Sequence, residues 1–197
     1  SSNEVSGTSE VGGLVGYLYS QAKGVNTITL SYSNSLVTAT GNDAGGLVGK
    51  AYAVKGAINS ISKSYATGNV SGNIYVGGLV GQVGYSSVDN SFATGETTAT
   101  NYVSSLAGLF NYSTLTNSYA IGKINTSGAN VGGLVASATS STGENVYFSS
   151  QTTGYIKTAL GMNLKIYKML SKETSYSNYN FDFLILIPHL FRQLTLV

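Results

Sequence analysis

The sequence contains no cysteine and no tryptophan, and it has a single histidine, a single proline and a single arginine. Without cysteine the chain can form no disulfide, no thiolate nucleophile and no cysteine-ligated zinc or iron–sulfur site. The His-Glu-x-x-His site of a metallopeptidase needs two imidazoles, so one histidine excludes it. That histidine, His189, lies beside Pro188 in an apolar tail, where we expect a structural role. We therefore predict no metal site.

Charge is also scarce. Only 9% of the residues are charged, against about 25% in an ordinary soluble domain. The formal net charge of +2 is too small for the basic footprint of a nucleic-acid-binding protein, so we expect no nucleic-acid partner. Residues 1–156 hold five lysines against six acids, whereas residues 157–197 hold four lysines and one arginine against two acids. The basic C-terminal part would suit an anionic surface, but solvated lysines are the simpler interpretation.

The acidic residues do not form a recognisable catalytic motif. They are Glu4, Glu10, Asp43, Asp89, Glu96, Glu144, Glu173 and Asp182. Glycoside hydrolysis would need two carboxylates about 5–10 Å apart, and stacking of repeats could bring some of these acids to one face. None of them has a basic neighbour in a known motif, so we interpret them as solvated turn residues. We predict that the chain is not an enzyme and has no catalytic residue and no cofactor.

What the sequence has in abundance is glycine, with 25 copies, and internal repetition. Repetition is sought first, because missing it leads to the wrong fold. Five related six-residue segments are Val11–Gly16, Ala44–Gly49, Val76–Gly81, Leu106–Asn111 and Val131–Ala136, and each has Gly and Leu at its third and fourth positions. A second element begins at Ser31-Tyr32, Ser64-Tyr65, Ser91-Phe92 and Ser118-Tyr119, with Val146-Tyr147 as a divergent fifth copy.

Each repeat contains two or three short runs rich in Val, Ile, Leu, Tyr and Thr, separated by Gly, Asn, Asp and Ser, which is typical of strands and turns. One such unit cannot bury its apolar side alone, but stacked units give every strand a partner about 4.8 Å away. We therefore predict an all-β fold, a parallel β-solenoid of about five repeats. A β-propeller or a β-sandwich is the alternative, although propeller blades need about 40–45 residues.

Stacking would place equivalent residues above one another. The repeated leucines would form an aliphatic ladder. An aromatic ladder would contain Tyr32, Tyr65, Phe92, Tyr119 and Tyr147. An asparagine ladder would contain Asn90, Asn117 and Asn145, whose amides could satisfy one another at a turn.

Tyrosine is the other abundant residue, with 15 copies. Six that lie outside the expected aromatic ladder are Tyr17, Tyr19, Tyr52, Tyr75, Tyr85 and Tyr112. Exposed tyrosine offers apolar area and a hydroxyl at small entropic cost, as at many binding interfaces. These residues either line a contact face for a glycan or a protein, or pack between the rungs, and the sequence leaves both readings open.

The pattern Val-Gly-Gly-Leu-Val-Gly, preceded by Asn-Ser-Tyr-Ala-Thr-Gly-x-Val, resembles the GLUG motif. The best matches are Gly45–Gly49 and Ser64–Gly81, and the resemblance covers about residues 5–150. Proteins with this repeat include adhesins related to filamentous haemagglutinin and the non-catalytic part of some IgA-specific metallopeptidases. The resemblance implies a non-catalytic repeat module of a secreted or surface-exposed bacterial adhesin. Its partner would be a protein or glycan on a host cell or a neighbouring cell.

The C-terminal part differs in its pattern of residues, so we divide the chain into two parts. These are a repeat solenoid, residues 1–156, and a C-terminal cap or tail, residues 157–197. The spacing of Leu160, Leu164 and Tyr167 loosely predicts an amphipathic helix from Ala159 to Lys172, which would cap the solenoid. The apolar run Leu184–Leu190 is too short for a membrane helix, and Pro188 interrupts it, so we expect no transmembrane segment. Residues 146–183 resemble the closing segment of such arrays, which usually continues to a tryptophan that this chain lacks.

We expect an extracellular or cell-surface location and a parent chain longer than this one, because the repeat is under way by residue 5 and no signal-peptide pattern precedes it. Two alternatives remain: an accessory region of a larger secreted peptidase, or another binding solenoid for ice or glycan. Threonine pairs such as Thr27–Thr29, Thr38–Thr40 and Thr97–Thr100 suggest an ice-binding face. They do not recur at one repeat position in the sequence, and a flat ice-binding face would require that.

Overall fold

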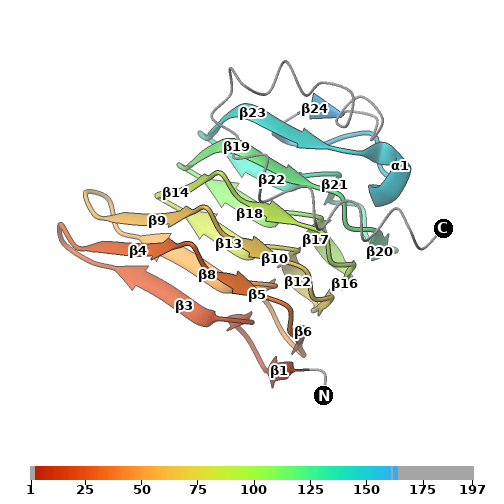
Figure 1. Cartoon of the computed structure of the whole chain (residues 1–197), viewed down its shortest axis with the longest axis horizontal. Helices are drawn as coiled ribbons and strands as arrows, with labels where there is room; N and C mark the ends of the chain where they lie inside the picture. Colours follow the sequence, from red (N-terminus) through yellow and green to blue (C-terminus); the bar gives the residue numbers. More distant parts are fainter. Residues whose placement is uncertain (1–2, 161, 164–197) are drawn as a thin grey trace.

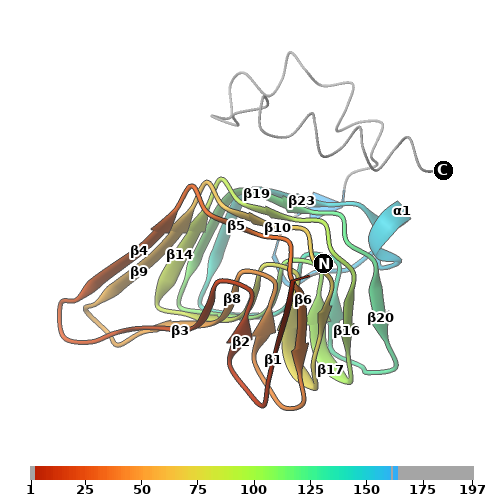
Figure 2. The same cartoon turned by 60° about the horizontal axis from the view of Figure 1, so that its bottom comes forward.

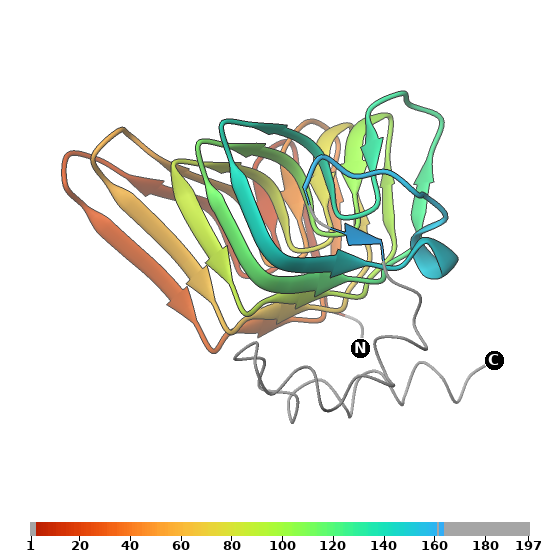
Figure 3. The ribbon, with the colours of Figure 1, turned by 90° about the horizontal axis from the view of Figure 1, so that it is seen from above.

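A computed structural model describes residues 3–160 and 162–163, and it is an all-β parallel solenoid of about five turns. Figure 1 shows the strands of successive turns side by side, and Figure 3 shows the turns following one another in sequence order along the solenoid. Every strand pairing is parallel, as predicted, because each turn of the chain returns in the same direction above the one before. We call one such turn a coil.

Four parallel sheets, named A to D in chain order, form the walls. Sheet A contains β1 (Glu4–Gly7), β6 (Leu36–Ala39), β11 (Val70–Ser71), β16 (Thr97–Ala99) and β20 (Ile124–Thr126). Sheet B contains β2 (Val11–Gly12), β7 (Ala44–Gly45), β12 (Ile74–Gly77), β17 (Asn101–Ser104) and β21 (Val131–Gly132). Sheet C contains β3 (Val15–Ser20), β8 (Val48–Ala53), β13 (Val80–Gly84), β18 (Ala107–Asn111) and β22 (Val135–Thr139).

Sheet D is bent and has two panels. Its first panel contains β4 (Val25–Thr29), β9 (Ile58–Ser62), β14 (Ser86–Asp89), β19 (Thr114–Ala120) and β23 (Thr142–Phe148). Its second panel contains β5 (Tyr32–Ser33), β10 (Tyr65–Ala66), β15 (Phe92–Ala93) and β24 (Met162–Asn163), and it shares β19 and β23 with the first. Each coil therefore has more and shorter strands than the two or three runs that the sequence indicated.

Single residues in the left-handed backbone region turn the corners. Between the two panels of sheet D these are Leu30, Lys63, Asn90, Asn117 and Asn145, with φ from 46° to 53°. At the start of sheet B they are Glu10, Asp43, Tyr75 and Tyr102, of which the two tyrosines lie within the first residues of β12 and β17. Non-glycine residues rarely adopt this conformation, and here they adopt it at the same point of successive coils. One residue is thus enough to redirect the chain from one sheet to the next.

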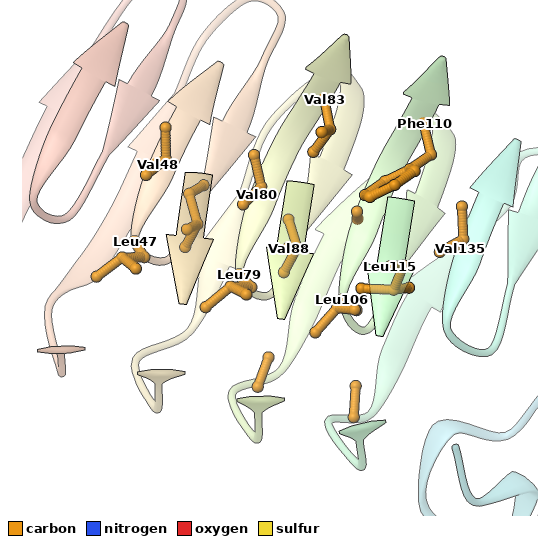
Figure 4. Packing of buried hydrophobic residues seen from close by; sticks show 14 of the residues in the cluster. Leu47, Val48, Leu79, Val80, Val83, Val88, Leu106, Phe110, Leu115 and Val135 are labelled. Carbon is orange, nitrogen blue, oxygen red and sulfur yellow. The ribbon is translucent and has the colours of Figure 1, made fainter. Parts of the chain in front are cut away.

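The interior contains two hydrophobic cores. The larger lies between sheets C and D and includes Leu47, Leu79, Leu106 and Leu134, which are at most 1% exposed. Figure 4 shows Leu47, Leu79 and Leu106 in line along the solenoid, with Val48 and Val80 near the first two. The smaller core lies between sheets A and B and is built mainly from valine and alanine, such as Val37 and Val76. The predicted leucine ladder is therefore confirmed for Leu47, Leu79 and Leu134, whereas Leu106 takes the place expected for Leu109 and Leu14 is 50% exposed.

The structure corrects the alignment of one repeat. Val80 pairs with Ala107, so Leu79 is equivalent to Leu106 and Gly81 to Gly108. The fourth copy of the motif is therefore Val103–Gly108, with two buried serines in place of the glycine pair. Alignment of the repeats by sequence places this copy three residues later, because Gly108-Leu109 matches the Gly-Leu of the other copies. Leu109 instead lies outside the core, opposite Gln82.

The last glycine of the motif has a clear steric reason. A Cβ atom at Gly81 would lie 2.5 Å from the carbonyl oxygen of Gly49 and 2.7 Å from the amide nitrogen of Ala44, both in the preceding coil. Contacts this short do not occur, so a side chain here would push two coils apart. The glycine allows sheet C to pass directly over the corner that leads into sheet B.

The coils differ in length. Tyr32 pairs with Tyr65, 33 residues later, whereas Tyr65 pairs with Phe92, 27 residues later. In the longer first two coils, sheets C and D extend into an arm that ends in a turn, at residues 21–24 and 54–57. Figure 2 shows this arm, made by β3, β4, β8 and β9, projecting from the body of the solenoid. In the third coil, Tyr85 alone separates the two strands.

The end of the solenoid after β22 is covered by residues 155–160. The amide of Gly133 donates to the carbonyl of Lys157 at 2.7 Å, and the amide of Ala159 donates to the carbonyl of Val135 at 2.8 Å. The expected helix does not begin at Ala159, because this stretch caps the sheet and Met162–Asn163 then pairs with β23. The one helix among the described residues is α1 (Ser150–Thr153). The rest of the expected helix, Leu184–Leu190 and His189 lie outside the described residues.

Candidate functional site

Five tyrosines form one continuous row along the outer side of sheet C and its adjoining corner. They are Tyr17, Tyr19, Tyr52, Tyr85 and Tyr112, and we call them the tyrosine row. Their successive ring centroids are 5.3, 6.4, 5.8 and 4.8 Å apart. The row crosses four coils, and Tyr17, Tyr19 and Tyr112 are each at least 41% exposed. Of the six tyrosines selected from the sequence, five are thus brought together.

The strand pattern explains where the rings point. In β3 and β8 the side chains alternate, so Leu18 and Ala51 pack inward while Tyr19 and Tyr52 face outward. In the shorter third coil the position opposite Tyr52 is Gly84, and the aromatic residue is moved to the corner at Tyr85, with φ of 49°. A Cβ atom at Gly84 would lie 2.6 Å from Cδ2 of Tyr52, so this glycine makes room for the ring.

The orientation of the rings limits what they can bind. The Tyr19–Tyr52 and Tyr85–Tyr112 pairs are stacked, with interplanar angles of 15° and 4°. Stacked rings cover one another's faces, so each pair presents mainly ring edges and phenol hydroxyls to solvent. The row is therefore a ridge of hydrogen-bonding groups on an apolar support.

A small charged cluster lies beside this row. The ammonium group of Lys50 is 3.5 Å from Asp43 Oδ2, 3.6 Å from Glu10 Oε1 and 5.6 Å from the ring centroid of Tyr17. Glu10 and Asp43 occupy equivalent corners of the first two coils, because Val11 pairs with Ala44. Burial raises the pKa of the Asp43 carboxyl, and the nearby Lys50 only partly opposes this effect. Burial likewise raises the pKa of Tyr17.

Tyr75 does not join the tyrosine row. It lies at the corner where sheet B begins, where it is equivalent to Asp43, and its ring centroid is 5.1 Å from that of Tyr102. Both residues have positive φ, 58° and 48° respectively. The corner thus carries acids in the first two coils and tyrosines in the next two.

The aromatic ladder predicted from the sequence is present on the second panel of sheet D. Tyr32, Tyr65, Phe92 and Tyr119 stack at 5.2, 4.8 and 5.1 Å, and Tyr147 pairs with Tyr119 in the same register. Tyr32 is 61% exposed, whereas Tyr119 is 1% exposed, and this burial raises its pKa well above the ordinary value. We interpret this ladder as structural rather than as part of a contact face.

The asparagine ladder is formed only in part. Nδ2 of Asn145 donates to Oδ1 of Asn117 at 3.2 Å, as expected for stacked amides. The amides of Asn117 and Asn90 instead donate to the carboxylate of Asp89, at 3.0 and 2.6 Å. Asp89, one residue before the corner, therefore accepts both amides, and this takes the place of a bond between Asn90 and Asn117.

The serines that precede the aromatic ladder have a role that the sequence did not reveal. The hydroxyl of Ser91 donates to the carbonyl of Asp89 at 2.8 Å, across the corner residue, and accepts the amide N–H of Ser64 at 3.2 Å. Ser118 repeats both bonds one coil later, with Thr116 and Ser91. Each serine thus stabilises its own corner and ties it to the preceding coil. The recurrence of a serine directly before four of the five ladder aromatics was the sequence signal that could have indicated this role.

The acids are distributed over different walls. Asp89 and Glu144 lie in one row of sheet D with Thr116 between them, whereas Glu96 precedes sheet A and contacts Lys123 and Asn125. Among residues 3–160 and 162–163, no group of three His, Cys, Asp or Glu side chains could hold a metal ion. In the same residues, no helix has the length and apolar character needed to cross a membrane.

Comparison with known families agrees with the geometry of the coil. The model of the GLUG motif matches residues 72–100. The chain therefore contains at least one GLUG motif. The matched segment begins before β12 and ends after β16, so it covers a single coil, and the pairing register carries the same pattern to the other coils. No curated protein and no solved structure gives a significant match to the chain.

Proposed function

We propose that this GLUG-motif solenoid is a non-catalytic module of a secreted or surface-exposed bacterial adhesin, which contacts host or neighbouring cells through its tyrosine row. The observation that carries the proposal is the continuity of that row over four coils, with rings in contact at every step. Aromatic side chains with a polar end are favoured at binding surfaces because they supply contact area with few rotatable bonds.

The rest of the face supports a contact role. Lys50 is balanced by Glu10 and Asp43, so the row adjoins a nearly neutral, hydrogen-bonding surface rather than a strongly charged one. Such a surface suits an uncharged stretch of protein or glycan, and its affinity would depend little on salt. The regular coils supply a rigid support, since every strand of the inner coils has a partner on both sides.

The test is a binding screen of the purified chain against host glycans, matrix proteins and whole cells. A double variant, Tyr19→Ala with Tyr112→Ala, removes two exposed members of the row from different coils. Tyr32→Ala is the matched control, because Tyr32 is similarly exposed but lies on sheet D. We expect saturable binding that the double variant weakens about tenfold or more and the control leaves unchanged.

Two results would overturn the proposal. Binding that is weakened equally by Tyr32→Ala would show that the tyrosine row is not the contact face. Absence of binding across the whole panel, by a chain with the circular dichroism of a folded β protein, would make the module a spacer.

A further inference from the structure

The first panel of sheet D carries a regular outer surface that is independent of the tyrosine row. Its strands β4, β9, β14, β19 and β23 lie side by side across all five coils (Figure 2). Their outward side chains form two parallel rows, which we call the hydroxyl rows. The first row is Thr27, Ser60, Ser87, Thr114 and Thr142. The second row is Thr29, Ser62, Asp89, Thr116 and Glu144.

This arrangement corrects in part the expectation that threonine pairs do not recur at one position: Thr27–Thr29 recurs as Thr114–Thr116, although it is not equivalent to Thr38–Thr40. Thr27–Thr29 is equivalent to Ser60–Ser62, Ser87–Asp89, Thr114–Thr116 and Thr142–Glu144. Because serine and acids replace threonine in several coils, a search for threonine alone misses the repeat. Thr38 and Thr98 belong to sheet A, where they form a single row with Ser71.

The geometry of the two rows is set by the sheet. Neighbouring members of one row are about 4.8 Å apart, the spacing of hydrogen-bonded strands, and the two rows are about 6.8 Å apart, because two residues separate them along a strand. The inward side chains between the rows, Ile28, Ile61, Val88 and Leu115, are buried in the larger core and hold the strands in place. The outer surface is therefore rigid as well as periodic.

Several of these groups are already oriented by their neighbours. The hydroxyl of Ser62 donates to Thr29 Oγ1 at 3.2 Å, and the hydroxyl of Thr116 donates to Asp89 Oδ1 at 2.5 Å. Asn117 also donates to Asp89 Oδ1. A ligand would thus meet hydrogen-bonding groups whose positions are fixed before it arrives, which reduces the entropy lost on binding.

We propose that the hydroxyl rows bind a neutral β-1,4-linked polysaccharide chain that lies along the solenoid axis, with about one sugar unit over each coil. Consecutive sugars of such a chain follow one another at nearly the spacing of the coils, with alternate sugars turned over. Each sugar therefore lies over an equivalent pair of side chains, and every second sugar lies over its pair in the same orientation. Serine and threonine hydroxyls both donate and accept hydrogen bonds, as sugar hydroxyls do. Individually weak contacts then add along the row.

Charge selects the class of polysaccharide. The rows contain two acids, Asp89 and Glu144, and no basic residue, so a uronic-acid or sulfated polymer would be repelled. The same acids argue against ice as the ligand. A charged carboxylate keeps its own hydration shell, and the serines lack the methyl group that threonine would present to ordered water.

The experiment measures retention of the whole chain on insoluble cellulose and chitin, with insoluble alginate as the acidic polymer. Calorimetry with soluble β-1,4-linked glucan and chitin oligomers measures the dependence on length. We expect retention on at least one neutral polymer and none on alginate. Affinity should rise with each sugar up to about five units, one for each coil, and then level off.

The variant Ser87→Val with Thr114→Val removes two neighbouring hydroxyls from the first row, and valine suits an exposed strand position. Thr38→Val with Thr98→Val makes a comparable change in sheet A. We expect about a tenfold loss of affinity in the first variant, none in the second, and none in the variant of Tyr19 and Tyr112. This last comparison separates the proposal from the function proposed for the tyrosine row.

Three outcomes would overturn the proposal: no retention on either neutral polymer, equal losses in the sheet D and sheet A variants, or retention on alginate as strong as on the neutral polymers. Thermal hysteresis that disappears in the Ser87 and Thr114 variant, without polysaccharide binding, would assign the rows to ice instead.

Discussion

The leucine of the repeated motif is exposed at one end of the solenoid and buried at the other. Leu14 in the first coil is 50% exposed, whereas its equivalent in the last coil, Leu134, is 0% exposed. Both belong to the same motif and lie at the same point of the coil. At the last coil, Thr158 and the neighbouring backbone cover the edge, while among the described residues nothing lies beyond the first coil. A coil thus buries its apolar side chains only when another layer lies on it.

The last glycine of the motif shows the same asymmetry. A Cβ atom at Gly16, in the first coil, would meet one atom within 3 Å, the carbonyl oxygen of Glu10 in its own coil. At Gly81 it would meet several backbone atoms of the preceding coil. At this last position of the motif, the requirement for glycine therefore comes largely from the contact between coils. At the first glycine of the pair it comes first from the same coil, because a Cβ atom at Gly12 would lie 2.1 Å from the carbonyl oxygen of Val15.

Replacing the motif leucine by alanine, once in an inner coil and once in the first coil, gives the largest expected difference in stability. Leu79→Ala, in the middle of the array, should lower the free energy of unfolding by about 2–5 kcal/mol, because it leaves a cavity in a closed core. Leu14→Ala should cost less than about 1 kcal/mol, since water already reaches that side chain. Urea denaturation followed by far-ultraviolet circular dichroism measures both values.

A coil added in front of residue 4 would sharpen the comparison of the two leucines. With a copy of the third coil fused there, Leu14 should become as sensitive to alanine as Leu79. Equal effects of Leu14→Ala and Leu79→Ala in the original chain would contradict the view that burial comes from the neighbouring coil.

Residues 155–160 cover one end of the solenoid, which we call the closed end, and the uncovered first coil is the open end. The closed end depends on Thr158. Its hydroxyl oxygen accepts the amide N–H groups of Leu134 and Val135 at 3.3 and 2.9 Å, and it also lies 3.1 Å from the carbonyl of Val135. Thr158→Val keeps the shape of the side chain but removes these bonds, at a cost of about 1–3 kcal/mol. The amide hydrogens of the closed end should then exchange faster, as those of the open end do.

Hydrogen exchange measured by mass spectrometry tests this change. Peptides that contain β22 should lose protection in Thr158→Val, whereas peptides that contain β3 serve as the internal control and should stay unchanged. Unaltered protection of β22 would show that the backbone bonds of Gly133 and Ala159 are enough to close this end.

The sequence was sufficient to predict the parallel solenoid, the aromatic ladder and most of the leucine ladder, because these depend on the same kind of residue recurring at one position. It was misleading where a different residue fills an equivalent position. Val103–Gly108 has serines in place of the glycine pair, and the alignment therefore moved to the wrong leucine. The hydroxyl rows were missed for the same reason, since serine and acids alternate with threonine.

The tyrosine row could not have been assembled from spacing alone. Tyr19 and Tyr52 are true register partners, but Tyr85 reaches the row from a corner, because the third coil is shorter by five residues in the arm. Only the paired strands on each side of that deletion, with Gly84 opposite Tyr52, show that the three rings meet. Changes in coil length therefore decide which side chains become neighbours.

Near the open end, pH provides the smallest and most local test. Burial raises the pKa of Asp43 in the folded chain above its value in the unfolded chain, and Glu10 adds to this effect while Lys50 opposes it. The folded state therefore binds the proton more tightly, so this group's contribution to stability is greatest in acid and is lost as the pH rises through the folded pKa. Asparagine at position 43 cannot titrate. From about pH 3 to about pH 7, the free energy of unfolding of the wild type should fall relative to that of Asp43→Asn.

The neighbouring acid supplies the control for this measurement. Glu10→Gln removes the repulsion from the equivalent corner of the first coil, so it should reduce the pH-dependent difference without abolishing it. If the wild type instead gains stability relative to Asp43→Asn as the pH rises, the attraction of Lys50 outweighs burial. The second coil would then be as open to water at this corner as the first, and the contrast between the outer and inner coils would be confined to the leucine core.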